Sequence, residues 1–193
     1  RWIFISMSVL LVLMSVYRFF FFYSYNISNR PFTGSAFLLG LRYDARVVSA
    51  IGLAMMLLGL AGFLNPFRNK KVRAFWLVLL SIVFFVFLIT YIADYYHYDY
   101  LQQRLSASVI NFLPDAKISF GMVTETYPVF TIVFIMILMI VLFTWSQQRL
   151  LKFTAARSTQ QITGKHRKWY FIVSFLLFAG LIFGRVGQYP LRW

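Results

Sequence analysis

Five long runs of apolar residues dominate this chain, and the segments between them hold nearly all of its charged side chains. A helix needs about 20 apolar residues to cross the hydrocarbon core of a bilayer. The runs that approach this length cover residues 2–22, 47–64, 75–93, 129–145 and 169–183. The pattern therefore predicts an all-α, polytopic membrane protein, in which residues 1–193 form a transmembrane domain of five helices.

The composition agrees with lipid as the solvent of these runs. Hydrophobic residues make up 61% of the chain and charged residues only 12%, whereas about a quarter of a soluble domain is charged. The net charge is +14. The basic residues lie in short clusters between apolar runs and form no basic domain face, so we expect no nucleic-acid partner.

The basic clusters also predict the orientation in the membrane. Residues 65–73 contain four basic side chains, residues 146–168 contain six, and neither segment has an acid. All five acids lie in the other connections, at Asp44, Asp94, Asp99, Asp115 and Glu125. Because Lys and Arg accumulate in cytoplasmic loops, we expect the N-terminus in the cytoplasm and the C-terminus outside.

The outer connection between the third and fourth spans is long enough to carry structure of its own. Leu101, Leu105, Val109 and Phe112 recur at helical spacing, and Pro114 would end that helix. Asp115 could cap a second short helix. We therefore expect short interfacial helices here, which either pack at the membrane surface or form one wall of a lipid-headgroup site.

Charged residues at the outer mouth of the second span are the first candidates for ligand binding. Arg42 and Arg46 lie four residues apart, on one face of a helix, with Asp44 between them. The arginine fork suits a phosphate group. Alternatively, the two arginines are a positive rim that anchors the helix end, with Asp44 as a partner.

Arg18 is the one charge inside a predicted span, near its outer end. Charges at membrane depth usually face a partner or a cavity. Asp94 closes the third span on the same predicted side, so Arg18 and Asp94 form a plausible ion pair. The sequence shows no nucleophile–base pair, phosphate loop or metal-ligand cluster, and it has no cysteine. We therefore assign no catalytic residue, metal ligand or cofactor to this chain.

Four passages of the chain resemble the bacterial lipoteichoic acid synthase family, a membrane-bound branch of the alkaline phosphatase and sulfatase superfamily. They are Phe37–Asp44, with its Gly-x-Arg-aromatic-Asp order; Asp94-Tyr95-Tyr96 with Tyr98 and Arg104-Leu105; Asn111-Phe112-Leu113 with Asp115 and Tyr127-Pro128; and Gly184-Arg185 with Pro190-Leu191-Arg192-Trp193. Each passage is short, and it is their order and spacing that carry the resemblance.

The resemblance implies a domain that anchors a phospholipid-headgroup transferase in the bacterial cytoplasmic membrane. Family members move phosphoglycerol or a related group from a lipid such as phosphatidylglycerol. They do so with an extracytoplasmic catalytic domain that holds a divalent metal, usually manganese. That domain would follow residue 193. Our own headgroup-binding candidates are Arg42, Arg46, Arg104 and Arg18, with Asp44 and Asp94 as ion-pair partners.

A different class of function also fits the residues. The chain could be a non-catalytic membrane protein that acts through its helices alone, as a lipid sensor or an assembly partner. Whether the gene continues past Trp193 into a metal-binding domain would discriminate between the two hypotheses.

Overall fold

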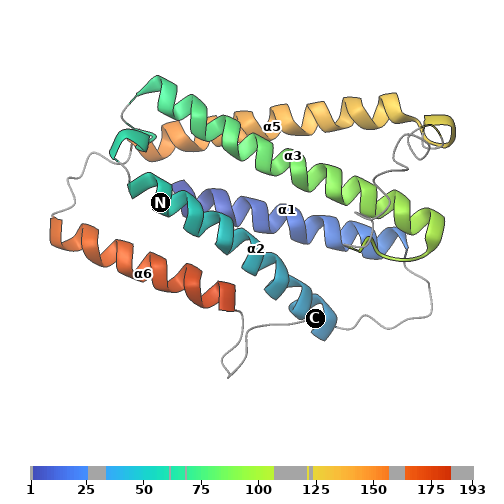
Figure 1. Ribbon diagram of the computed structural model, residues 1–193, viewed down its shortest axis with the longest axis horizontal. Helices are drawn as coiled ribbons and strands as arrows, with labels where there is room; N and C mark the ends of the chain where they lie inside the picture. Colours follow the sequence, from blue (N-terminus) through green and yellow to red (C-terminus); the bar gives the residue numbers. More distant parts are fainter. Residues whose placement is uncertain are drawn as a thin grey trace. The chain divides into compact units, whose positions relative to one another are not determined.

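The computed structural model describes residues 2–25, 34–60, 62–67, 69–106, 121, 124–156 and 164–183. Regular secondary structure within these ranges is helical, with no strand. The helices are α1 (Trp2–Ser24), α2 (Gly34–Leu60), the short 3-10 helix η1 (Gly62–Leu64), α3 (Lys70–Leu101), α5 (Val129–Ala156) and α6 (Gly164–Phe183) (Figure 1). The chain forms two compact units, residues 77–148 and the remainder.

Four of the helices are long and apolar enough to cross a membrane. They are α1, the Phe37–Leu60 part of α2, α3 and α5. This confirms an all-helical fold over the described residues, with the several long apolar helices that a multi-pass membrane protein requires. The apolar part of α6, Trp169–Phe183, is shorter, so the fifth crossing remains a prediction.

Three helices extend well beyond the apolar runs that predicted them, and one of these is α5, which continues past Trp145 to Ala156. α2 begins at Gly34 and not near Val47, while α3 covers Lys70–Leu101 and not only 75–93. The predicted limits marked where apolar side chains begin, and a helix continues into water wherever its backbone bonds remain satisfied. Because of these extensions, Arg42, Asp44 and Arg46 lie within α2, and Asp94 and Asp99 lie within α3.

The outer connection after α3 differs from its prediction. Leu101 is the last residue of α3, and residues 102–106 are not helical. Leu101 and Leu105 therefore do not share the face of one helix, as the proposed amphipathic pattern required. Val109, Phe112, Pro114 and Asp115 lie outside the described residues, so the rest of that prediction stands untested.

The larger unit is built around α2, which packs against both α1 and α6 (Figure 1). Phe178 of α6 is 3% exposed, and its ring lies against Gly52, where an added Cβ would come within 2.8 Å of the ring carbons. On its other side, Phe178 stacks on Phe4 of α1, with 4.8 Å between ring centroids. The absence of a side chain at Gly52 thus allows Phe178 of α6 to pack closely against α2.

The smaller unit pairs α3 with α5. Phe84 and Phe143 are buried and stack with 4.2 Å between ring centroids. The hydroxyls of Ser81 and Thr144 lie 2.7 Å apart, so one donates to the other, and the hydroxyl that accepts can donate to a carbonyl of its own helix. In a region without water such satisfied hydroxyls can join helices at little cost.

The outward faces of these helices are strongly apolar. Phe130 and Phe134 of α5 and Leu176 of α6 are 95%, 69% and 63% exposed. In water such surfaces would promote association. Against hydrocarbon tails they need no protein partner, which agrees with the membrane assignment.

Candidate functional site

The charged residues of α2 divide between two sides of the helix. Successive residues turn by about 100° around an α-helix. Gly40 and Asp44 therefore share one side of α2, whereas Arg42 and Arg46 share the opposite side. Burial follows the same division, because Gly40 and Asp44 are buried, Arg42 is exposed and Arg46 is half-buried. The outer end of α2 thus has an anchoring side and a basic side.

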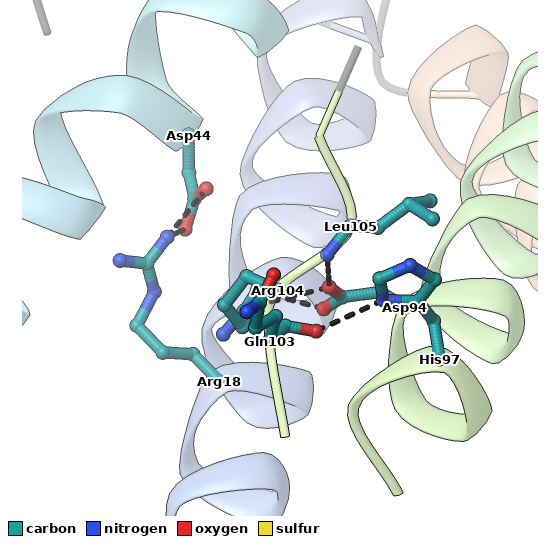
Figure 2. Close-up of polar contacts among 7 residues, drawn as sticks. All are labelled: Arg18, Asp44, Asp94, His97, Gln103, Arg104 and Leu105. Carbon is teal, nitrogen blue, oxygen red and sulfur yellow. Dashed lines mark hydrogen bonds and ion pairs between the residues drawn. The ribbon is translucent and has the colours of Figure 1, made fainter. Parts of the chain in front are cut away.

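Asp44 makes an ion pair with Arg18 that joins α2 to α1 (Figure 2). The Arg18 Nη2 atom donates to both carboxylate oxygens, at 2.8 Å and 2.7 Å. The Asp44 side chain is 9% exposed and that of Arg18 is 31% exposed. The carboxylate is therefore covered, while part of the Arg18 side chain remains exposed.

This pairing differs from the one that the sequence suggested. We expected Arg18 to pair with Asp94, but Arg18 binds Asp44, and Asp94 binds Arg104. The sequence placed Asp44 on a different helical face from Arg42 and Arg46, but it did not show that this face meets α1. Had α2 been extended to Gly34, the four-residue spacing of Gly40 and Asp44 would have marked a side able to receive Arg18.

Gly40 provides the space that Arg18 occupies. The Arg18 Nη1 and Cζ atoms lie where a Cβ on residue 40 would be built, and Arg18 Nε would be 2.9 Å from that Cβ. Any side chain at this position would displace the guanidinium. Sequence reasoning missed this role for Gly40, since the contact depends on how α1 and α2 are packed.

Asp94 organises the chain that leaves α3 (Figure 2). Its carboxylate accepts hydrogen bonds from Arg104 Nε at 3.1 Å and from the Leu105 N–H at 2.9 Å, and Arg104 Nη2 lies 2.8 Å from its second oxygen. His97 Nδ1 lies 2.9 Å from the Gln103 carbonyl oxygen. These contacts fold residues 103–105 back beside the last turns of α3.

Aromatic residues join the start of α5 to the same part of α3. The rings of Tyr96 and Tyr127 lie 4.4 Å apart, and the Tyr127 hydroxyl donates to Asp99 at 3.5 Å. Desolvation, and secondarily the charge on Asp99, raises the pKa of Tyr127 above its ordinary value. Its hydroxyl therefore stays protonated and acts as a donor across the neutral pH range.

The four arginine candidates belong to different units and to different sides of one helix. Arg42 and Arg46 share the basic side of α2, while Arg18 is bound on the opposite side of that helix. Arg104 belongs to the smaller unit, where Asp94 is its carboxylate partner. The candidate site for an anionic group within α2 is therefore the pair Arg42 and Arg46.

Within the described part of the chain, no three or more His, Asp or Glu side chains gather in a way that could hold a metal ion. Comparison with protein families, curated proteins and solved structures finds no match to this chain. The likeness to lipoteichoic acid synthases thus remains a prediction from short passages of sequence.

Proposed function

We propose that this chain is the membrane domain of a phospholipid-headgroup transferase. It would anchor the enzyme and present a phosphoglycerol-type headgroup at the outer surface of the membrane. The binding residues would be Arg42 and Arg46.

The observation that carries this proposal is the separation of charges on α2. Asp44 faces α1 and is bound by Arg18, so it does not lie on the side that holds Arg42 and Arg46. Helices α1 and α2 together contain three arginines and one aspartate, so the net charge of the two helices is +2. A phosphodiester carries one negative charge and offers two oxygens, which suits the arginine fork.

The position of the two arginines along α2 also fits a headgroup ligand. Arg46 directly precedes the uncharged stretch 47–60 of α2. At 1.5 Å per residue that stretch covers about 21 Å of the hydrocarbon core. Arg42 and Arg46 would then lie at the level of the phosphates, where long basic side chains are stable.

The remaining parts of the proposal concern topology and location. The basic connections would lie in the cytoplasm and the mouth of α2 outside, in the cytoplasmic membrane of a bacterium. α6, with 20 residues, is about 30 Å long and would make the fifth crossing. A catalytic domain with a manganese-type metal would then receive the headgroup outside the cell.

Lipid binding tests the site directly. We expect the double variant Arg42→Lys/Arg46→Lys to bind phosphatidylglycerol about tenfold more weakly in nanodiscs, a difference of about 1.4 kcal/mol, because lysine keeps the charge but loses the fork. Arg149→Lys, an exposed residue of α5 in a predicted cytoplasmic segment, is the matched control. Unchanged binding by the double variant, together with unchanged transfer activity in the full-length protein, would show that the arginines only anchor the helix.

Topology can be tested separately because the chain has no cysteine. Tyr100 is 80% exposed, near the end of α3, and Asn69 is exposed just before that helix begins. A single cysteine at Tyr100 should react with a membrane-impermeant thiol reagent added to intact cells, whereas one at Asn69 should react only after lysis. The reverse pattern would invert the proposed orientation.

A further inference from the structure

At Gly40 of α2, an arginine side chain occupies the space where a Cβ would be built. The occupant, Arg18, is the residue whose Nη2 holds both oxygens of Asp44. Gly40 and Asp44 are one turn apart on the same side of α2. The space beside Gly40 and the carboxylate of Asp44 together form the binding site for the Arg18 guanidinium.

We infer that Gly40 is a positioning residue for the headgroup site formed by Arg42 and Arg46, an inference that rests on the proposed function. Gly40 acts through Arg18 and Asp44, whose ion pair fixes the rotation of the outer turns of α2. That rotation keeps the side bearing Arg42 and Arg46 directed away from α1.

A methyl group added at Gly40 would occupy the place of the Arg18 guanidinium. The displaced atoms are the end of the flexible Arg18 side chain, so the steric cost itself is small. The guanidinium can move aside, but it then leaves the position from which it binds both Asp44 oxygens. We therefore expect Gly40→Ala to release the rotation of α2 that the Arg18–Asp44 ion pair fixes, without disrupting the packing of the core.

Gly59 offers a matched control on the same helix. An added Cβ at Gly59 meets no atom within 4 Å, and replacing a helical glycine with alanine favours the helix. Gly40→Ala and Gly59→Ala therefore each add one methyl group to α2, while only Gly40→Ala displaces Arg18.

A spin label can report the rotation without reference to lipid binding. Leu38 is 62% exposed and lies one turn before Arg42, on the side that also holds Arg46. In a Leu38→Cys protein, we expect Gly40→Ala to change the accessibility of the label to oxygen and to a water-soluble relaxing agent. Gly59→Ala should leave both accessibilities unchanged.

The Arg18→Met background tests whether the effect passes through Arg18. There, Gly40→Ala should cause no further change at the label, because the guanidinium that it displaces is already absent. A full additional change in this background, or no change in the original protein, would overturn the inference.

Phosphatidylglycerol nanodiscs supply the second measurement. We expect Gly40→Ala to weaken lipid binding about fivefold, the low end of coupling between separate sites, while soluble glycerol phosphate at equal concentration should not compete if the ligand is a lipid. If Arg42→Lys/Arg46→Lys loses binding but Gly40→Ala keeps it, the positioning role is wrong and the site stands. If neither loses binding, the proposed function fails, while the label result still decides whether Gly40 sets the rotation.

Discussion

Two arginine–aspartate pairs occur within the part of the chain that the structure describes, and they are built in different ways. Arg18 and Asp44 are 26 residues apart and join two helices, whereas Arg104 and Asp94 are 10 residues apart and close a local turn. Both carboxylates are buried, but the Arg104 side chain is 58% exposed and that of Arg18 is 31% exposed. The first pair therefore holds tertiary structure, and the second shapes the chain beside one helix.

The partners of the two carboxylates extend this difference. Asp94 accepts a main-chain N–H from Leu105 as well as the bonds from Arg104. Asp44 binds an arginine that approaches from another helix, through a gap left by Gly40. We expect the interhelical pair to contribute more stability, since its loss leaves a guanidinium at the membrane boundary without its carboxylate.

The largest expected effect is that of Asp44→Asn. Asp44→Asn leaves the Arg18 guanidinium, whose side chain is 31% exposed, without its carboxylate, and losing one partner of such a pair costs roughly 3 kcal/mol. Unfolding of the detergent-solubilised protein, followed by circular dichroism during titration with a denaturing detergent, would measure the loss. Glu125→Gln removes an exposed carboxylate and serves as the control, and a loss no larger than in this control would refute the tertiary role of the pair.

Asp94→Asn should have a smaller effect. The asparagine oxygen can still accept from the Leu105 N–H, and the exposed Arg104 can be solvated, so we expect a loss of about 1 kcal/mol. The same unfolding measurement applies. A loss equal to that of Asp44→Asn would remove the distinction between an interhelical and a local pair.

The turn next to this local pair allows a change in the opposite direction. Gln102 follows α3 with a φ of 55°, and its N–H donates to the Tyr98 carbonyl at 2.8 Å. A residue in this left-handed conformation at a helix end is most often glycine. Gln102→Gly should therefore raise the unfolding free energy by up to about 1 kcal/mol. The loss of the hydrogen bond from the Gln102 side chain to the Asp99 carbonyl will offset part of this gain. Gln102→Val should lower it, and a reversed order of the two variants would show that the turn does not require this backbone conformation.

The sequence predicted the helices better than it predicted their contacts. Apolar length located α1 closely, because Trp2–Ser24 is a helix with nearly the limits of its apolar run. The same criterion placed the start of the second helix at Val47, since the residues before it are polar, and so it missed the helical face shared by Gly40 and Asp44. Ion-pair partners depend on helix rotation and on small side-chain gaps, which apolar counting does not measure.

The smallest expected effect concerns Tyr127, whose hydroxyl links the start of α5 to Asp99. Desolvation and then the Asp99 charge raise the pKa of Tyr127 in the folded protein. A raised pKa means that the folded state holds the phenol proton more tightly than the unfolded state does. The resulting stability is complete below the unfolded pKa of about 10 and is lost as the pH rises through the folded value. Tyr127→Phe should thus change the unfolding free energy little at neutral pH and should reduce its decline at alkaline pH.

Asp99→Asn should bring the pKa of Tyr127 closer to the ordinary value for tyrosine, as measured by NMR of ring-labelled tyrosine. An unchanged titration in Asp99→Asn would mean that Asp99 does not contribute to the raised pKa of Tyr127, and that the contact with Asp99 does not help to hold α5 against α3.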